Sequence, residues 1–162
     1  MKTSILEYLE ESARKYPDKT AFADEHTSCT FKELEQTARR TGTALAKHFT
    51  SRNPVPVFME KSVETIGVFM GAVYAGCFYV PVNPMNPTER LRKIMEKLDP
   101  EVIISDEKGK EQLAAVGNGL ENKVMGPEAL KTATGTELSE EQHSRLEQIQ
   151  GQWLSLIHIS EP

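Results

Sequence analysis

Three short apolar runs, separated by helical segments, constrain the fold of this chain more than any other feature. The runs cover residues 55–59, 77–82 and 102–105, and apolar residues at helical spacing fill 63–75 and 87–98 between them. The runs do not alternate apolar with polar residues, which is typical of strands buried on both faces of a parallel sheet. The order therefore predicts an α/β fold in three layers, in which two right-handed crossovers place helices over a parallel sheet.

Capping signals predict further helices before this sheet. Ser4 and Glu7 have the spacing of a capping box, and so do Thr30 and Glu33. Between these two signals, short strand-like pieces flank a polar turn and predict a hairpin. The further elements that we expect are a helix over 4–15, strands at 20–24 and 28–31, a helix from 30 to near 49, a helix at 110–116, a strand at 123–125, and helices at 127–131 and 139–149.

Charge and composition argue against several classes of function. Lys and Arg total 19 against 24 Asp and Glu, a formal net charge of −5, so the chain lacks the basic excess on which nucleic-acid binding depends. The longest mostly apolar stretch, residues 66–82, is interrupted by glycine and proline, which predicts no membrane span. Cys29 and Cys77 lie far apart in the sequence, so we expect no disulfide framework and a cytoplasmic location.

Four segments carry a resemblance to a known family. They are residues 29–34 (CTFKEL), 67–84 (GVFMGAVYAGCFYVPVNP), 87–91 (PTERL) and 102–106 (VIISD). In order and spacing they resemble the core motifs of the adenylate-forming superfamily, and they look closest to D-alanine–carrier-protein ligases and peptide-synthetase adenylation domains. Two positions depart from the family pattern: its usual Asp is Asn83 here, and its common Lys is Tyr74. The resemblance implies the parallel-sheet N-terminal lobe of the adenylate-forming fold, incomplete.

The resemblance also implies a function for the full-length parent protein. Such ligases use ATP and Mg²⁺ to join a carboxylate, here an amino acid by the nearest likeness, to AMP, and then pass the acyl group to the thiol of a carrier protein or CoA. They hold the phosphates with a Gly/Ser/Thr-rich loop that ends in Pro-Lys-Gly. This sequence contains no such loop, and residues 132–136 (TATGT) lack the Pro-Lys-Gly.

We therefore expect residues 1–153 to be the N-terminal part of an AMP-binding adenylation domain, inactive alone and without a cofactor of its own. We assign no residue a catalytic, cofactor-binding or metal-binding role.

The last nine residues, 154–162, do not fit the pattern before them. LSLIHISEP is an apolar, strand-prone run after a polar, Gln-rich segment. It resembles the conceptual translation of a transposase adapter used to prepare sequencing libraries, CTG TCT CTT ATA CAC ATC TCC GAG CCC. We expect these residues to be adapter read-through, and we leave them out of the fold.

Two alternative functions stay open at this stage. Asp106 ends an apolar strand, as does the phospho-acceptor of signalling receiver domains, but a receiver also needs an acidic pair for Mg²⁺. The segment after residues 55–59 supplies only Glu60, beside Lys61. The second alternative is a non-catalytic α/β binding module.

The remaining candidate groups favour structural interpretations. We expect close helix–sheet packing and a helix C-cap from the glycines, solvent exposure for the histidines, and an ordinary acidic helix face from the glutamates. These residues are Gly67, Gly71 and Gly76; His26, His48 and His143; and Glu137, Glu140, Glu141 and Glu147.

Overall fold

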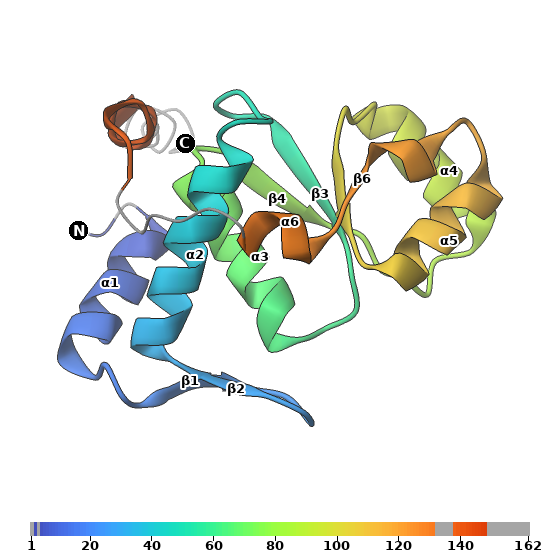
Figure 1. The fold of residues 1–162 in the computed structure, drawn as a ribbon. Helices are drawn as coiled ribbons and strands as arrows, with labels where there is room; N and C mark the ends of the chain where they lie inside the picture. The colour runs from blue at the N-terminus through green and yellow to red at the C-terminus, as the bar shows by residue number, and fades with distance from the viewer. Residues whose placement is uncertain (1, 3, 132–137, 149–162) are drawn as a thin grey trace, which may run out of the picture.

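The computed structural model describes residues 2, 4–131 and 138–148 of the chain. The elements follow the predicted order, and Figure 1 shows helices on both sides of a central sheet. Their bounds are α1 (Ile5–Lys15), β1 (Thr20–Ala23), β2 (Ser28–Thr30), α2 (Phe31–Leu45), β3 (Pro54–Phe58), α3 (Val63–Tyr74), β4 (Phe78–Pro81), α4 (Thr88–Leu98), β5 (Ile103–Ser105), α5 (Glu107–Val116), the 3₁₀ helix η1 (Leu120–Lys123), β6 (Val124–Met125) and α6 (Pro127–Lys131). Residues 140–148 are also helical. The loop 132–136 and the tail 154–162 lie outside the described residues.

The main sheet has the strand order β4-β3-β5-β6, and each of its pairings is parallel. The chain leaves β3 for β4 on one side and then passes back beyond β3 to β5 on the other. Crossovers of one hand that run in opposite directions place their helices on opposite faces of a sheet, so α3 and α4 cover different faces. The predicted α/β fold with a parallel sheet is confirmed, and so is the antiparallel β1–β2 hairpin.

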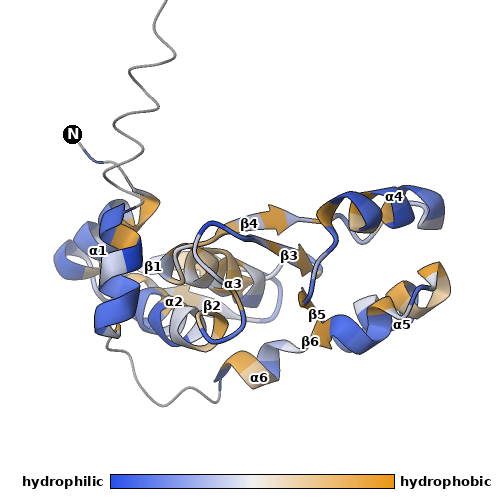
Figure 2. Ribbon diagram, turned by 90° about the horizontal axis from the view of Figure 1, so that it is seen from above, coloured by the Kyte–Doolittle hydropathy of each residue, from blue (hydrophilic) through white to orange (hydrophobic). Residues whose placement is uncertain are grey.

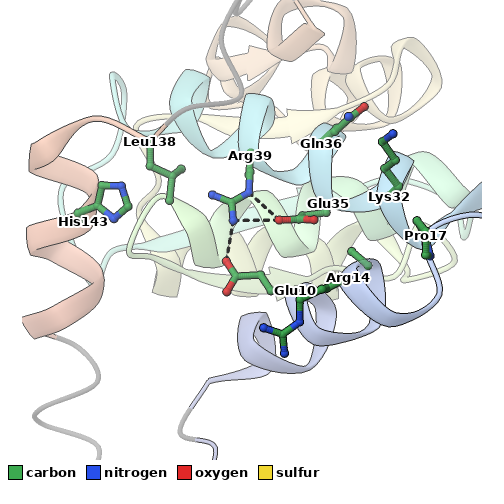
Figure 3. Close-up of a pocket in the computed structure, with 10 residues that line it drawn as sticks. Glu10, Arg14, Pro17, Lys32, Glu35, Gln36, Arg39, Leu138 and His143 are labelled. Carbon is green, nitrogen blue, oxygen red and sulfur yellow. Dashed lines mark hydrogen bonds and ion pairs between the residues drawn. The ribbon is translucent and has the colours of Figure 1, made fainter.

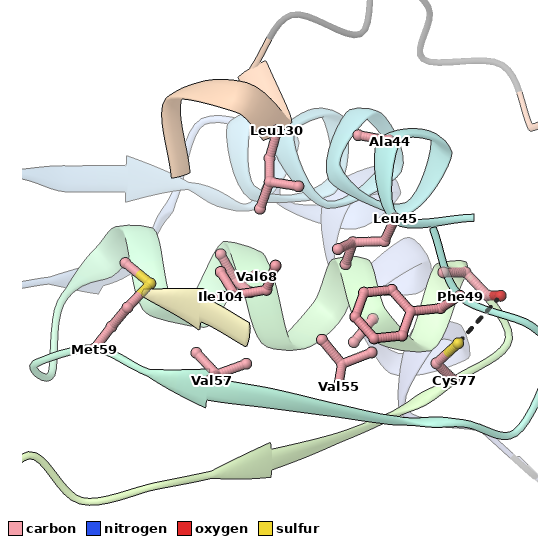
Figure 4. Close-up of a cluster of buried hydrophobic side chains, with 12 residues drawn as sticks. Ala44, Leu45, Phe49, Val55, Val57, Met59, Val68, Cys77, Ile104 and Leu130 are labelled. Atoms are coloured by element: carbon pink, nitrogen blue, oxygen red, sulfur yellow. Dashed lines mark hydrogen bonds between the residues drawn. The ribbon is translucent and has the colours of Figure 1, made fainter. Parts of the chain in front are cut away.

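Each face of the sheet has its own apolar core. Neighbouring residues of β5 belong to different cores: Ile104 is buried on the face of α2 and α3, and Ile103 is buried on the face of α4 and α5. Figure 4 shows the first core, where Leu130 of α6 closes the top of the cluster beside α2. In Figure 2, hydrophilic residues colour much of α1 and α4, the helices on the outside of the fold.

The central strand β3 can contain Pro54 and Pro56 because β5 pairs only with the last residues of β3, Val57 and Phe58. The carbonyls of Asn53 and Val57 accept hydrogen bonds from the amides of Phe78 in β4 and of Val82 just after it, at 3.3 and 2.9 Å. Backbone groups of successive residues in a strand point to alternate neighbours, so the backbone nitrogens of Pro54 and Pro56 point away from β4, toward the β5 side. The pairing with β5 begins only at Val57, so neither proline occupies a position that needs an amide donor.

The prediction of full burial is wrong for one strand. β3 and β5 are buried almost throughout, but β4 is exposed at both ends, and Phe78 is 52% exposed. β4 lies at the edge of the sheet, where only one neighbouring strand covers it. Pro81 at the end of this strand offers no amide to a further strand, a common feature of exposed edges.

The helix starts follow the capping signals. Both predicted capping boxes are present, with Ser4 bonded to its N3 partner Glu7 and Thr30 to Glu33. α5 begins at Glu107, three residues before its predicted start, because the Asp106 side chain accepts from the Gly109 amide at 2.8 Å and caps the first turn. The 3₁₀ helix η1 was not predicted. α2 ends at Leu45, and turns carry the chain on to Phe49.

The closest contact between helices joins α2 and α3, where two glycines face the opposite helix. A Cβ atom added at Gly71 would lie 2.4 and 2.5 Å from the side chain of Thr41, and one at Gly42 would lie 2.5 Å from the Cβ of Tyr74. Real Cβ atoms do not approach other atoms so closely, so both positions require glycine. The prediction that Gly71 packs closely against the sheet is wrong in its partner, because the atoms beside Gly71 belong to helix α2.

We predict that Gly71→Ala lowers the free energy of unfolding by about 1–3 kcal/mol, because overpacking outweighs the gain in helix propensity of about 1 kcal/mol. Gly67→Ala on the same helix is the matched control. Its added Cβ would meet only the Thr37 methyl carbon, at 3.2 Å, a contact that a shift of a few tenths of an ångström relieves, so we expect little change. Urea denaturation followed by circular dichroism compares the two variants. Equal stability of both would contradict the proposed contact.

Candidate functional site

The carboxyl ends of β3 and β4 border an apolar groove. Ligands of doubly wound sheets bind at this edge. The groove, about 850 Å³ in volume, lies between the β1–β2 hairpin and the segments that follow β3 and β4. Apolar side chains provide much of its lining, including Phe22, Met59, Phe69 and Met85. Met85 is 85% exposed.

Asp24 joins the hairpin to the start of α3 at one end of this groove. One carboxylate oxygen accepts from the amides of His26 and Thr27 at 2.9 and 2.8 Å, and the other accepts from the Val63 amide at 2.9 Å. These amides, with that of Val63 foremost, hold the pKa of the Asp24 carboxyl well below its usual range. The first amide of α3 is thus already paired with a carboxylate.

The remaining polar groups at the start of α3 are also paired. Ser62 accepts from the Thr65 amide at 3.1 Å, and the Thr65 hydroxyl donates to the Glu60 carbonyl at 2.7 Å. An incoming phosphate would have to displace these bonds and would be repelled by the carboxylate of Asp24. The residues at this edge therefore do not fit the triphosphate of ATP.

Asp106, the basis of the receiver-like alternative, is a helix cap rather than a free carboxylate. Its side chain accepts from Gly109, while the preceding Ser105 donates to the Phe58 carbonyl at 2.7 Å. A Cβ at Gly109 would lie 2.1 Å from the Ser105 hydroxyl oxygen, so the chain is tightly packed around this end of β5. Glu60, the single acidic residue after β3, forms an ion pair with Lys108. The arrangement does not support a phospho-acceptor site.

A second cavity, of about 770 Å³, lies between α1, α2 and the helix of residues 140–148. Figure 3 shows Arg39 at its centre, bonded to Glu10 of α1 and Glu35 of α2, both at 2.9 Å. The Tyr74 hydroxyl of α3 donates to the same Glu10 carboxylate at 2.9 Å, and its ring lies 5.0 Å from the Arg39 guanidinium. Burial raises the pKa of Tyr74, and the charge of Glu10 raises it further.

This cluster binds three helices together through hydrogen bonds and an ion pair. Arg39 donates to both carboxylates, and Tyr74, which is fully buried, has its one donor paired. No local sequence pattern predicts the cluster, because Glu10 and Tyr74 are 64 residues apart. Tyr74 in place of the family's common Lys was the one available signal.

The other groups singled out in the sequence occupy structural positions. His26, His48 and His143 are exposed, as predicted, and Gly76 ends α3 with a φ of 75°. Among the described residues, no three His, Cys, Asp or Glu side chains are placed to hold a metal ion together. In the same part of the chain, no helix is long and apolar enough to cross a membrane.

Comparisons with known proteins agree with this fold. A sequence profile described as "AMP-binding enzyme" matches residues 9–155. Over 115 residues the chain is 33% identical to the D-alanine--D-alanyl carrier protein ligase of Listeria welshimeri, covering 70% of this chain and 22% of that ligase. Over 113 residues it is 32% identical to bacitracin synthase 1 of Bacillus licheniformis, covering 69% of this chain and 2% of that synthase.

A solved structure shows the same arrangement of elements. The nonribosomal peptide synthetase FmoA3 in its AMPPNP-bound form matches with a TM-score of 0.71 and 22% identity, over 84% of this chain and 14% of that one. The fold is thus that of an α/β lobe of adenylate-forming enzymes. The chain belongs to the AMP-binding enzyme family, which confirms the resemblance found in its motifs. It spans about a fifth of the D-alanine ligase that it matches and a far smaller share of bacitracin synthase 1.

We predict that Asp24→Ala lowers the stability of the chain at pH 7, since three amides lose their acceptor. The folded-state pKa of Asp24 lies below that of the unfolded chain, about 4, so the stabilisation is present above this pH. It is lost as the pH falls through the folded-state pKa. Urea denaturation at pH 7 and pH 3 should show a smaller difference between wild type and variant at pH 3.

Glu25→Ala is the matched control for this prediction. Glu25 is the exposed neighbour of Asp24 in the same turn, and its removal deprives none of these amides of an acceptor. A difference between Asp24→Ala and wild type that is the same at both pH values would contradict the proposed role of the carboxylate.

Proposed function

We propose that this chain is the N-terminal lobe of an ATP-dependent ligase. The parent enzyme activates a carboxylate, an amino acid, as an acyl adenylate and transfers the acyl group to the thiol of a carrier protein or CoA. The observation that carries this proposal is the match of residues 9–155 to the AMP-binding enzyme family. A carrier-protein ligase among the relatives and a nonribosomal peptide synthetase among the similar structures support the choice of substrate and acceptor.

In this proposal the nucleotide chemistry belongs to parts of the parent that this sequence does not contain. The sequence has no Gly/Ser/Thr-rich loop ending in Pro-Lys-Gly. At the open edge of the sheet, the first amide of α3 is already paired with Asp24, and no metal-binding cluster occurs among the described residues. The described residues thus do not fit ATP or Mg²⁺, so we derive no catalytic step from them. What this lobe supplies is a rigid, doubly covered sheet.

A cytoplasmic location completes the proposal. Cys29 is half-buried and Cys77 is buried, and both are free thiols. Burial raises the pKa of the Cys77 thiol, so its reactive thiolate form is disfavoured. Two unpaired thiols in a chain of this size are typical of a reducing compartment.

We predict that the chain alone catalyses no carboxylate-dependent exchange of labelled pyrophosphate into ATP above background. Millimolar MgATP should also leave its thermal midpoint unchanged, since a ligand that binds only the folded state would raise it. The D-alanine--D-alanyl carrier protein ligase of Listeria welshimeri, assayed with D-alanine, is the positive control. Turnover or a raised midpoint would mean that this lobe carries a nucleotide site of its own.

We also propose that residues 154–162 form no part of the native protein. Deleting them should change the free energy of unfolding by less than about 0.5 kcal/mol, the usual range for changes away from packed features. Removal of a strand-prone segment with little charge should also improve solubility. Urea denaturation and sedimentation of the full chain and of residues 1–153 test both statements. A loss of more than about 1 kcal/mol on deletion would show that the tail is packed into the fold.

A further inference from the structure

The carboxyl end of α2 lacks a cation of its own. The last turn of α2 contains no basic residue, although the partial negative charge of a helix C-terminus favours one. Turns follow at residues 46–48, so the carbonyls of Ala46 and Phe49 lie beyond the last residue of α2. Carbonyls at a helix end accept from water or from donors elsewhere in the chain.

Arg145, about a hundred residues further on, supplies the missing donors. Its guanidinium donates to the Phe49 carbonyl at 3.1 Å and, more weakly, to the Ala46 carbonyl at 3.5 Å. The side chain is only 16% exposed and also pairs with Glu141 one turn earlier. Leu138 and Leu146 pack against the apolar cluster shared by α1, α2 and α3. The segment 138–148 is thus docked beside the carboxyl end of α2 by the charged contact of Arg145, and on the helical layer by Leu138 and Leu146.

Gln142 weakens the same docked position. Its side-chain carbonyl accepts from the Ser139 amide at 3.0 Å and completes a cap at the start of the helix. The residue is only 2% exposed, yet its amide nitrogen has no hydrogen-bond partner. A buried donor without an acceptor favours the state in which water can reach it. Docking therefore buries an unpaired donor on the same side of the segment as Leu138 and Leu146, and this lowers the stability of the docked state.

We propose that residues 138–148 form a strap that opens and closes on α2 as one unit, held by Arg145 and loosened by Gln142. Opening removes Leu138 and His143 from the wall of the cavity between α1 and α2. It also returns the carbonyls of Ala46 and Phe49 to water. The strap opens without unfolding the α2–α3 pair, because the Arg39 cluster and the glycine contacts lie outside it.

Hydrogen exchange of the intact chain, measured by mass spectrometry, tests the proposal. In wild type the amides of residues 140–148 should exchange faster than those of α3 but more slowly than an unstructured peptide. Gln142→Met removes the unpaired donor together with the bond from the Ser139 amide. Because an unpaired buried donor costs more than one hydrogen bond contributes, exchange of the strap should still slow, by about threefold. Arg145→Gln should accelerate it about tenfold, while the amides of α3 change less than twofold in either variant.

Glu147→Gln is the matched control, since Glu147 is exposed on the same helix and should leave exchange unchanged. Strap amides that exchange at the rate of α3 in wild type and all variants would show that the segment opens only with global unfolding. Strap amides that exchange as fast as an unstructured peptide in wild type would show that the docked state is not populated. Failure of Gln142→Met to slow exchange would overturn the role of Gln142. Any of these three results refutes the proposal.

Discussion

The close contact between α2 and α3 is the constraint on which most of this lobe depends. Gly42 and Gly71 let the two helices approach until only Thr41 and the Cβ of Tyr74 fit between them. That approach buries Tyr74 completely and brings its hydroxyl to Glu10, so α1 is drawn into the same layer. The layer formed by these helices covers one face of the parallel sheet. A larger residue at either glycine would separate all of these elements at once.

The sheet itself is ordered around β3. β3 lies between β4 on one side and β5 on the other, and its residues alternate between the two cores. Val57 faces the core of α2 and α3, whereas Phe58 faces the core of α4 and α5. The groove at the carboxyl edge is a consequence of this topology. Asp24, Ser62 and Thr65, at its α3 end, are hydrogen-bonded within the protein, and much of the remaining lining is apolar.

Local sequence signals predicted the order of helices and strands, but they did not predict the contacts between residues far apart in the sequence. Each of these signals spans only a few residues: the capping boxes that begin at Ser4 and Thr30, and the apolar runs that end at glycine or proline. The family motifs were equally local and led to the correct family. The contacts of Asp24 with Val63, and of Arg145 with Phe49, join segments 39 and 96 residues apart. The spacing of residues in a single sequence does not predict which distant residues will be in contact. The exposure of β4 was missed because strand order, which puts it at the edge, is a property of the assembled sheet.

Our main proposal is that this chain is one lobe of a larger enzyme of the AMP-binding family, in which the nucleotide-binding segment is encoded after residue 153. The most direct test is to amplify the locus from the source genome with primers outside residues 154–162 and to sequence the product. The account predicts that the reading frame diverges at or near Trp153 and continues into a Gly/Ser/Thr-rich loop ending in Pro-Lys-Gly. A genomic sequence that encodes 154–162 and then a stop codon would contradict it.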